Sequence, residues 1–370
     1  MALLVFAWHW LFASFAMFWQ VLWSLLLGFM LSAMIQAYVP KGGLSKMFGH
    51  AGFRELALAT GLGAASSSCS YAAAATAKSM FKRGADFTVA MVFMFASTNL
   101  VIELGLVLWQ LMGWPFVVAE WVGGFLLIAT FVFFSKLLLP KRLVEEGRMH
   151  VEEEDNSGHD HGEMLAPGRT LMDKLRSSTG WTYVAHYFAM DWSMLQVDLL
   201  LGFVIAGFLA IAIPASLWQH VYVTSAPAPV RAVENALVGP LIAVVSFVCS
   251  IGNVPLAAVL WNAGSTFGGV IAFLYADLIV LPLIDAYRKY YGWALALRMA
   301  GVFYISMVVA GLIVELAFAA LHVTPHAHGS FLMRIETIQL NYTFVLNVFF
   351  GTAALVLVWW GRRSPMHHAM

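Results

Sequence analysis

The chain has 370 residues, of which 61% are hydrophobic and 11% are charged, and its formal net charge is zero. Soluble domains normally carry charge on about a quarter of their residues, so this composition excludes a water-soluble globular protein and indicates an integral membrane protein. The balanced charge, without a basic tract, excludes nucleic acid as an expected partner and leaves the lipid bilayer as the first one.

The first apolar stretch predicts a long membrane helix over residues 12–39, because roughly 20 apolar residues are needed to cross the hydrocarbon core. Residues 40–43, PKGG, end it. Two apolar runs follow that are each too short to span, residues 56–65 and the run from Cys69 to Lys82. Small polar residues separate them, which predicts a re-entrant hairpin or a discontinuous helix with its break near the bilayer middle.

Two full crossings, residues 87–112 and 117–139, complete the first half, and a polar segment then separates it from the second. The second half predicts a helix over 197–218, a broken hairpin over 232–263, a crossing over 267–284, and helices over 296–321 and 342–360. The expected divisions are a first membrane repeat (1–139), a polar cytoplasmic loop (140–192), a second membrane repeat (193–321), and an outer loop with the last helix (322–370).

The two hairpins belong to an internal repeat, because residues 66–96 match residues 246–276 without a gap. Three full crossings precede the central loop, so the second copy should enter the membrane upside down. The sequence predicts an all-α polytopic membrane protein of two inverted-topology repeats, each with a broken or re-entrant helix hairpin. The identical pairs include the chain's two cysteines: Ser66/Ser246, Cys69/Cys249, Ser70/Ser250, Ala77/Ala257, Gly84/Gly264, Phe87/Phe267, Phe93/Phe273 and Ala96/Ala276.

The distribution of lysine and arginine predicts the orientation. All but a few of these residues fall on one side of the expected topology, and Arg231 and Arg334 fall on the other. The positive side should be cytoplasmic. We therefore expect a multi-pass protein of the bacterial cytoplasmic membrane with seven full crossings, its N-terminus outside and its C-terminus inside.

The expected symmetry would bring the two hairpin tips together near the midplane, each with a Cys-Ser pair at the start of a half-helix. Two thiols suit a thiophilic metal or metalloid. The free N–H groups and positive dipole ends of two half-helices would instead suit a small inorganic oxyanion or sulfur species. In a third interpretation each cysteine is only a small buried apolar residue. The candidate substrate-binding residues are Ser68, Cys69, Ser70, Cys249, Ser250 and Asn253.

Polar residues within the apolar crossings form a second group of candidates. Asn99 and Glu103 are four residues apart in the first half, and Asp277 lies in the equivalent crossing of the second. Ionisable groups at membrane depth are costly, which favours a functional role such as proton coupling. The alternative is interhelical hydrogen bonding by a protonated acid. Glu315 is a weaker candidate.

The polar central segment contains the weak metal candidates His159 and His161. Their H-D-H spacing could hold a divalent metal, although an acidic run with Gly and Ser is more typical of a solvated loop. The sequence has no Walker P-loop, HExxH, GxSxG or haem-attachment motif, so we expect neither an enzyme nor a bound cofactor.

The paired blocks CSYAAAATAKSMFKRGADFTVAMVFMFASTN and SFVCSIGNVPLAAVLWNAGSTFGGVIAFLYADLIVLP resemble the ArsP-like family of predicted permeases. The resemblance covers residues 25–138 and 192–360. The best-known members export trivalent organoarsenicals from bacteria and carry a Cys-rich tip of the C-x-C-G type in the first block, where this chain has Cys69-Ser70-Tyr71. The chain looks closer to an uncharacterised permease branch, so the resemblance implies a permease without naming its solute.

Together these features predict a secondary permease that exports a small thiophilic solute, an inorganic or organometalloid species, by alternating access at the two Cys-Ser helix breaks. The rival interpretations are a transporter of a small inorganic oxyanion or sulfur species, a channel, and a non-transporting membrane scaffold. The sequence leaves the oligomeric state open.

Overall fold

The computed structural model describes residues 2–38, 45–66, 70–157, 171–212, 226–246, 250–325 and 342–363, and this part of the chain is entirely helical. Four of its helices are long and apolar enough to cross a membrane, namely Trp114–Leu138, Ala228–Ser246, Leu281–Ala320 and Tyr342–Gly361. Shorter apolar helices accompany them, among them Phe87–Asn99 and Phe267–Ile279. The fold is that of a polytopic helical membrane protein.

The first half of the chain begins with a long helix and continues with shorter ones. Gly28 of the first helix packs directly on the fourth, because a Cβ at Gly28 would lie 2.0 Å from the Ala72 Cβ. The elements are α1 (Ala2–Tyr38), α2 (Ser45–Phe48), α3 (Phe53–Ser66), α4 (Ser70–Lys82), α5 (Phe87–Asn99), α6 (Ile102–Met112) and α7 (Trp114–Leu138).

The centre of the chain contributes α8 (Lys141–Ser157), α9 (Leu171–Arg176) and α10 (Ser178–Ala212). The second half contains α12 (Ala228–Ser246), α13 (Ser250–Asn262), α14 (Phe267–Tyr275), the 3₁₀ turn η1 (Ala276–Ile279), α15 (Leu281–Ala320) and α16 (Tyr342–Arg363). Helix α15 is kinked at Gly292, whose φ of 79° lies in the left-handed region that favours glycine.

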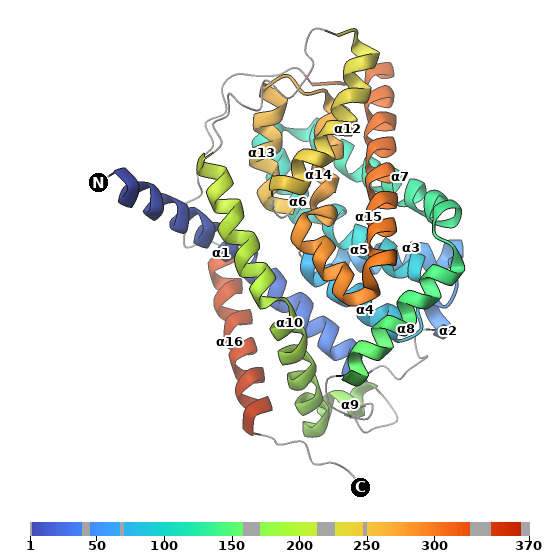
Figure 1. The fold of residues 1–370 in the computed structure, drawn as a ribbon, viewed down its shortest axis with the longest axis vertical. Coiled ribbons are helices and arrows are strands. Elements are labelled where there is room, and N and C mark those ends of the chain that lie inside the picture. The colour runs from blue at the N-terminus through green and yellow to red at the C-terminus, as the bar shows by residue number, and fades with distance from the viewer. Residues whose placement is uncertain are drawn as a thin grey trace.

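Helices α1, α10 and α16 contact one another along one flank of the molecule (Figure 1). The side chain of Asn347 on α16 accepts the amide N–H of Trp23 at 2.8 Å and donates to the carbonyl of Trp19 at 2.6 Å. Those two α1 groups would bond to each other in a regular helix, so Asn347 reaches into the α1 backbone. This side chain fixes α16 against α1.

The core lies beside this flank and is formed by α4, α5, α14 and the inner face of α15. All of α14 and nearly all of α4 and α5 are buried. Small residues allow these helices to approach closely: a Cβ at Gly268 would lie 2.3 Å from the carbonyl oxygen of Gly311, and one at Gly311 would lie 2.6 Å from that of Gly268. Close approach of small residues is the usual way in which helices pack within a bilayer.

Two expected crossings are not continuous helices. The expected helix over 87–112 is interrupted at Val101, which is extended (φ −94°, ψ 143°), and the one over 267–284 is interrupted at Val280 (φ −63°, ψ 145°). The structure therefore breaks the helix backbone within each expected crossing. At the second break, Pro282 lies in the first turn of α15. N–H groups in a first turn have no acceptor within the helix, so a proline, which lacks an N–H, is tolerated there.

The segment expected to be a polar loop also contains helices. Leu143, Gly147 and Val151 recur every four residues along α8; Leu143 and Val151 are buried, and a Cβ at Gly147 would lie 2.3 Å from Leu295 on α15. This period of four is the signature of an amphipathic helix. Helix α10 begins at Ser178, well before the expected start at residue 197.

Candidate functional site

The residues that start α4 and α13 meet at a single carboxylate oxygen. The Ser70 hydroxyl donates to Oδ2 of Asp277 at 2.5 Å, and the Ser250 hydroxyl donates to the same atom at 2.8 Å. All three side chains are buried, and Asp277 is fully so. Ser70 and Ser250 are the paired serines of the sequence repeat, so equivalent positions of two distant segments are joined through one acid.

The sequence repeat has a counterpart in the local backbone around these two helices. Both α4 and α13 are followed by a glycine of positive φ, Gly84 at 97° and Gly264 at 102°. In each copy the glycine amide and the next amide bond back to the last turn, at 3.1 to 3.2 Å. The Asp86 and Thr266 side chains then cap the next helix. In each copy the glycine turn ends one helix and the polar side chain caps the next. The chain thus reverses direction while these backbone N–H groups keep hydrogen-bond partners.

Asp277 lies in η1, between α14 and α15, where the expected crossing is broken. The break takes its carboxylate out of a regular helix and places it between the starts of α4 and α13. Its second oxygen, Oδ1, is buried and has no hydrogen-bond partner among the described residues. One oxygen therefore accepts two hydroxyls, and the backbone N–H groups of Asp277 and Leu278 also face the carboxylate.

A second buried acid, Glu120 on α7, was not selected by sequence reasoning. It is fully buried, and neither carboxylate oxygen has a hydrogen-bond partner within the described part of the chain. Helix α7, which carries Glu120, packs against α14, which leads into the η1 turn that carries Asp277. The Tyr275 hydroxyl, at the end of α14, donates to the backbone carbonyls of Ala119 at 3.2 Å and Glu120 at 3.0 Å. The available signal was a carboxylate inside the apolar run 117–139.

Two buried amides complete the group of polar side chains. Asn253 follows Ser250 by three residues, so both lie on the same face of α13, and neither atom of its amide group has a partner among the described residues. Asn99 ends α5 and donates to Phe95 at 3.2 Å and Thr98 at 3.1 Å, while its Oδ1 has no described partner. Buried polar groups are normally hydrogen-bonded, so these atoms are candidates for ligand contacts.

The remaining candidates divide into those that the structure places and those outside it. Glu315 accepts the amide N–H of Gly268, at the start of α14, at 2.5 Å, which satisfies a helix terminus. The backbone of Glu103 belongs to α6, but its side chain is outside the described part. Ser68, Cys69, Cys249, His159 and His161 also lie outside the described residues. Within the described residues, no group of three or more His, Cys, Asp or Glu could hold a metal ion.

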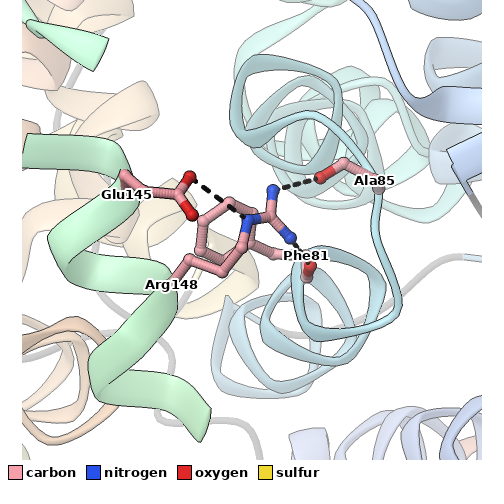
Figure 2. A network of polar contacts seen from close by, with 4 residues as sticks. All are labelled: Phe81, Ala85, Glu145 and Arg148. Carbon is pink, nitrogen blue, oxygen red and sulfur yellow. Dashed lines mark hydrogen bonds and ion pairs between the residues drawn. The ribbon is translucent and has the colours of Figure 1, made fainter. Parts of the chain in front are cut away.

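A separate polar contact lies at the other end of α4 (Figure 2). The guanidinium of Arg148 on α8 donates to the carbonyls of Phe81 at 2.5 Å and Ala85 at 3.0 Å, and it lies 4.0 Å from the centre of the Phe81 ring. Glu145 approaches it at 4.0 Å. Burial lowers the pKa of Arg148, and the neighbouring carboxylates, Glu145 first, raise it in part. Arg148 thus bonds to carbonyls of the last turn of α4 and of the turn that follows it, of which the Phe81 carbonyl also accepts the Gly84 amide.

Comparison with known proteins identifies the family. The family model described as "Predicted permease", ArsP_1, matches residues 9–316. The chain is also 47% identical over 309 residues to the Mycobacterium tuberculosis (strain ATCC 25618 / H37Rv) protein named "Putative permease Rv2963", with 82% of this chain and 76% of that protein covered. No solved structure matches. The match includes both helix starts, Asp277 and Glu120, and the chain belongs to the ArsP_1 family of predicted permeases.

Proposed function

We propose that this protein is a secondary permease of the bacterial cytoplasmic membrane that exports a small thiophilic solute by alternating access around the starts of α4 and α13. The observation that carries the proposal is the shared acceptor: Ser70 and Ser250 donate to one oxygen of Asp277. In secondary transporters, paired broken helices commonly form the solute site near the bilayer midplane.

The nature of the solute follows from what lies next to the two serines. Cys69 and Cys249 directly precede Ser70 and Ser250, and neighbouring Cα atoms are about 3.8 Å apart. We infer that both thiols belong to the solute site, where two thiols would suit a soft metal or metalloid species. An oxyanion held by the two helix N-termini would instead meet the Asp277 carboxylate, whose charge opposes it. We therefore favour a neutral or cationic soft solute.

Alternating access would use the two matched helix-turn-helix segments as movable parts. We infer that they form an inverted-topology repeat, which is supported by the paired glycine turns and by Figure 1, where α2 and α8 lie toward one end of the molecule and α12 toward the opposite end. Asp277 joins both segments, so weakening of the two serine contacts would let the two half-helices move relative to each other. This would open the site to the two faces in turn.

The test compares cells that express wild type, Cys69→Ser or Cys249→Ser for the accumulation of arsenite, methylated arsenicals, copper, thiosulfate and selenite. We expect wild type to lower the cellular content of one soft solute and both variants to lose this effect. Ser306→Ala is the matched control, since Ser306 is buried but donates only to Val302 in its own helix at 2.7 Å.

The other outcomes assign the rival functions. Movement of an oxyanion that survives both cysteine substitutions would favour recognition by the helix N-termini. If no solute moves and deletion of residues 145–165 still abolishes a phenotype, the protein acts as a membrane scaffold.

A further inference from the structure

We propose that Glu120 and Asp277 form a proton-exchange pair that holds one proton between them, which resides on Glu120 while both serines bond to Asp277. This inference rests on the proposed permease function and deepens it, because an exchangeable buried proton would supply the coupling ion. It assigns a role to Glu120, which lies on a different element from the serines and amides of the candidate site.

The first step is the cost of burying charge. An isolated ionised carboxylate in a medium of low dielectric constant is far too costly to remain charged unless it is paired or hydrogen-bonded. No lysine, arginine or histidine of the described chain forms an ion pair with Glu120 or Asp277. Two uncompensated negative charges on packed elements of one buried core would add mutual repulsion. The pair therefore holds at least one proton.

The second step is the unequal supply of hydrogen-bond donors. Asp277 receives two serine hydroxyls at one oxygen, and hydrogen bonds to a carboxylate stabilise its charged form. Glu120 receives none from the described residues. The charge of the pair is thus placed on Asp277 and the proton on Glu120. Two interacting acids of this kind titrate as a unit rather than singly.

The groups that face the pair do not change this assignment. Asp277 faces Ser70 on α4, Ser250 on α13 and the hydroxyl of Tyr287 on α15, and all three are neutral when protonated. Glu120 faces Tyr275 at the end of α14 and Asp277 itself. The side chain of Glu103, on the neighbouring α6, lies outside the described residues. The described surroundings contribute hydroxyls but no compensating cation.

The third step connects the proton to movement. A charged acceptor binds a hydroxyl about twice as strongly as a neutral one. When the proton passes from Glu120 to Asp277, the two serine contacts weaken and α4 and α13 are no longer held together. One O–H bond breaks on Glu120 and one forms on Asp277, and per cycle one proton enters from one face and leaves at the other. Protonation of Asp277 would therefore control whether α4 and α13 are held together by the two serine hydrogen bonds.

The direct test is infrared difference spectroscopy of the purified full-length protein in lipid bilayers. At neutral pH wild type should show the C=O stretch of a protonated carboxylic acid, and Glu120→Gln should lose part of that band. Glu315→Gln is the matched control for an acid that accepts a backbone N–H, and Asp277→Asn should retain the Glu120 band. Absence of the band from wild type would overturn the proposal, and so would a band that Glu120→Gln leaves unchanged. The wild-type spectrum is informative even if a variant fails to fold.

The functional test measures movement of the solute. In proteoliposomes with arsenite as the probe, Glu120→Gln should lose at least tenfold both in accumulation driven by a pH gradient and in exchange of labelled arsenite, because Asp277 no longer receives the proton that releases the two serines. Ser306→Ala, whose hydroxyl donates only within its own helix, should keep both. Retained pH-driven accumulation would contradict the pair. If wild type moves no arsenite, the proposed cargo fails, while the infrared result still decides the proton assignment.

Discussion

At the scale of single residues, the shared acceptor predicts what each serine contributes to stability. Ser70→Ala and Ser250→Ala each remove one hydroxyl donor to a buried carboxylate. Hydrogen bonds to charged groups contribute about 1.5–3 kcal/mol, so each variant should lower the unfolding free energy by about that amount. The measurement is denaturant unfolding of the purified protein in detergent micelles.

The double variant tests the coupling between the two serines. With both donors gone, Asp277 would take up a proton, and the total loss should be smaller than the sum of the single losses. Ser97→Ala is the control, because the buried Ser97 hydroxyl donates only to Met94 of its own helix, at 2.9 Å. If Ser97→Ala lowers the unfolding free energy as much as Ser70→Ala and Ser250→Ala do, the loss reflects removal of any buried hydroxyl rather than the contact with Asp277.

The sequence could predict part of this site but not all of it. Ser70, Ser250 and Asp277 were candidates because paired serines at helix breaks and an acid at membrane depth are both local patterns. Their common hydrogen bonds depend on how α4, α13 and η1 meet, which pairs residues far apart in the chain. Glu120 satisfied the same rule as Asp277, because it is a carboxylate inside the apolar run 117–139, but its relation to Asp277 depends on how α7 packs against α14.

At the scale of elements, Arg148 holds α8 against the C-terminal end of α4. A lysine at this position would keep the charge but could not present the planar fork that reaches Phe81 and Ala85 together. We expect Arg148→Lys to cost about 1–3 kcal/mol and to speed hydrogen exchange of the α8 amides. Arg142→Lys should have little effect, since Arg142 is an exposed partner of Glu146 and such pairs contribute about 0–1 kcal/mol. Equal effects would show that charge alone secures α8.

The same helix shows where sequence reasoning on elements failed. Its many charges suggested a solvated loop, although Leu143, Gly147 and Val151 already marked a buried face at helical spacing. The helix break at Val280 did have a local signal, because Pro282 follows it and proline ends or starts a helix. The break at Val101 has no neighbouring glycine or proline to mark it.

At the scale of the whole molecule, α15 predicts which faces of the membrane two surface positions occupy. Gly292, at its kink, lies against His150 of α8. From there α15 continues to Ala320, about 40 Å at 1.5 Å per residue, which exceeds the roughly 30 Å hydrocarbon core. We therefore expect α8 and His322 to lie on opposite sides, and the positive charges near α8 predict that α8 is on the cytoplasmic side.

Single cysteines can test this arrangement in a Cys69→Ser, Cys249→Ser background. A membrane-impermeant maleimide added to intact cells should label His322→Cys and should label Arg142→Cys only after the cells are opened, because both positions are exposed but face different compartments. Labelling in the reverse pattern would invert the orientation while keeping α15 as a crossing. If both positions react in intact cells, α15 does not separate the two faces, and the alternating-access proposal loses the barrier on which it depends.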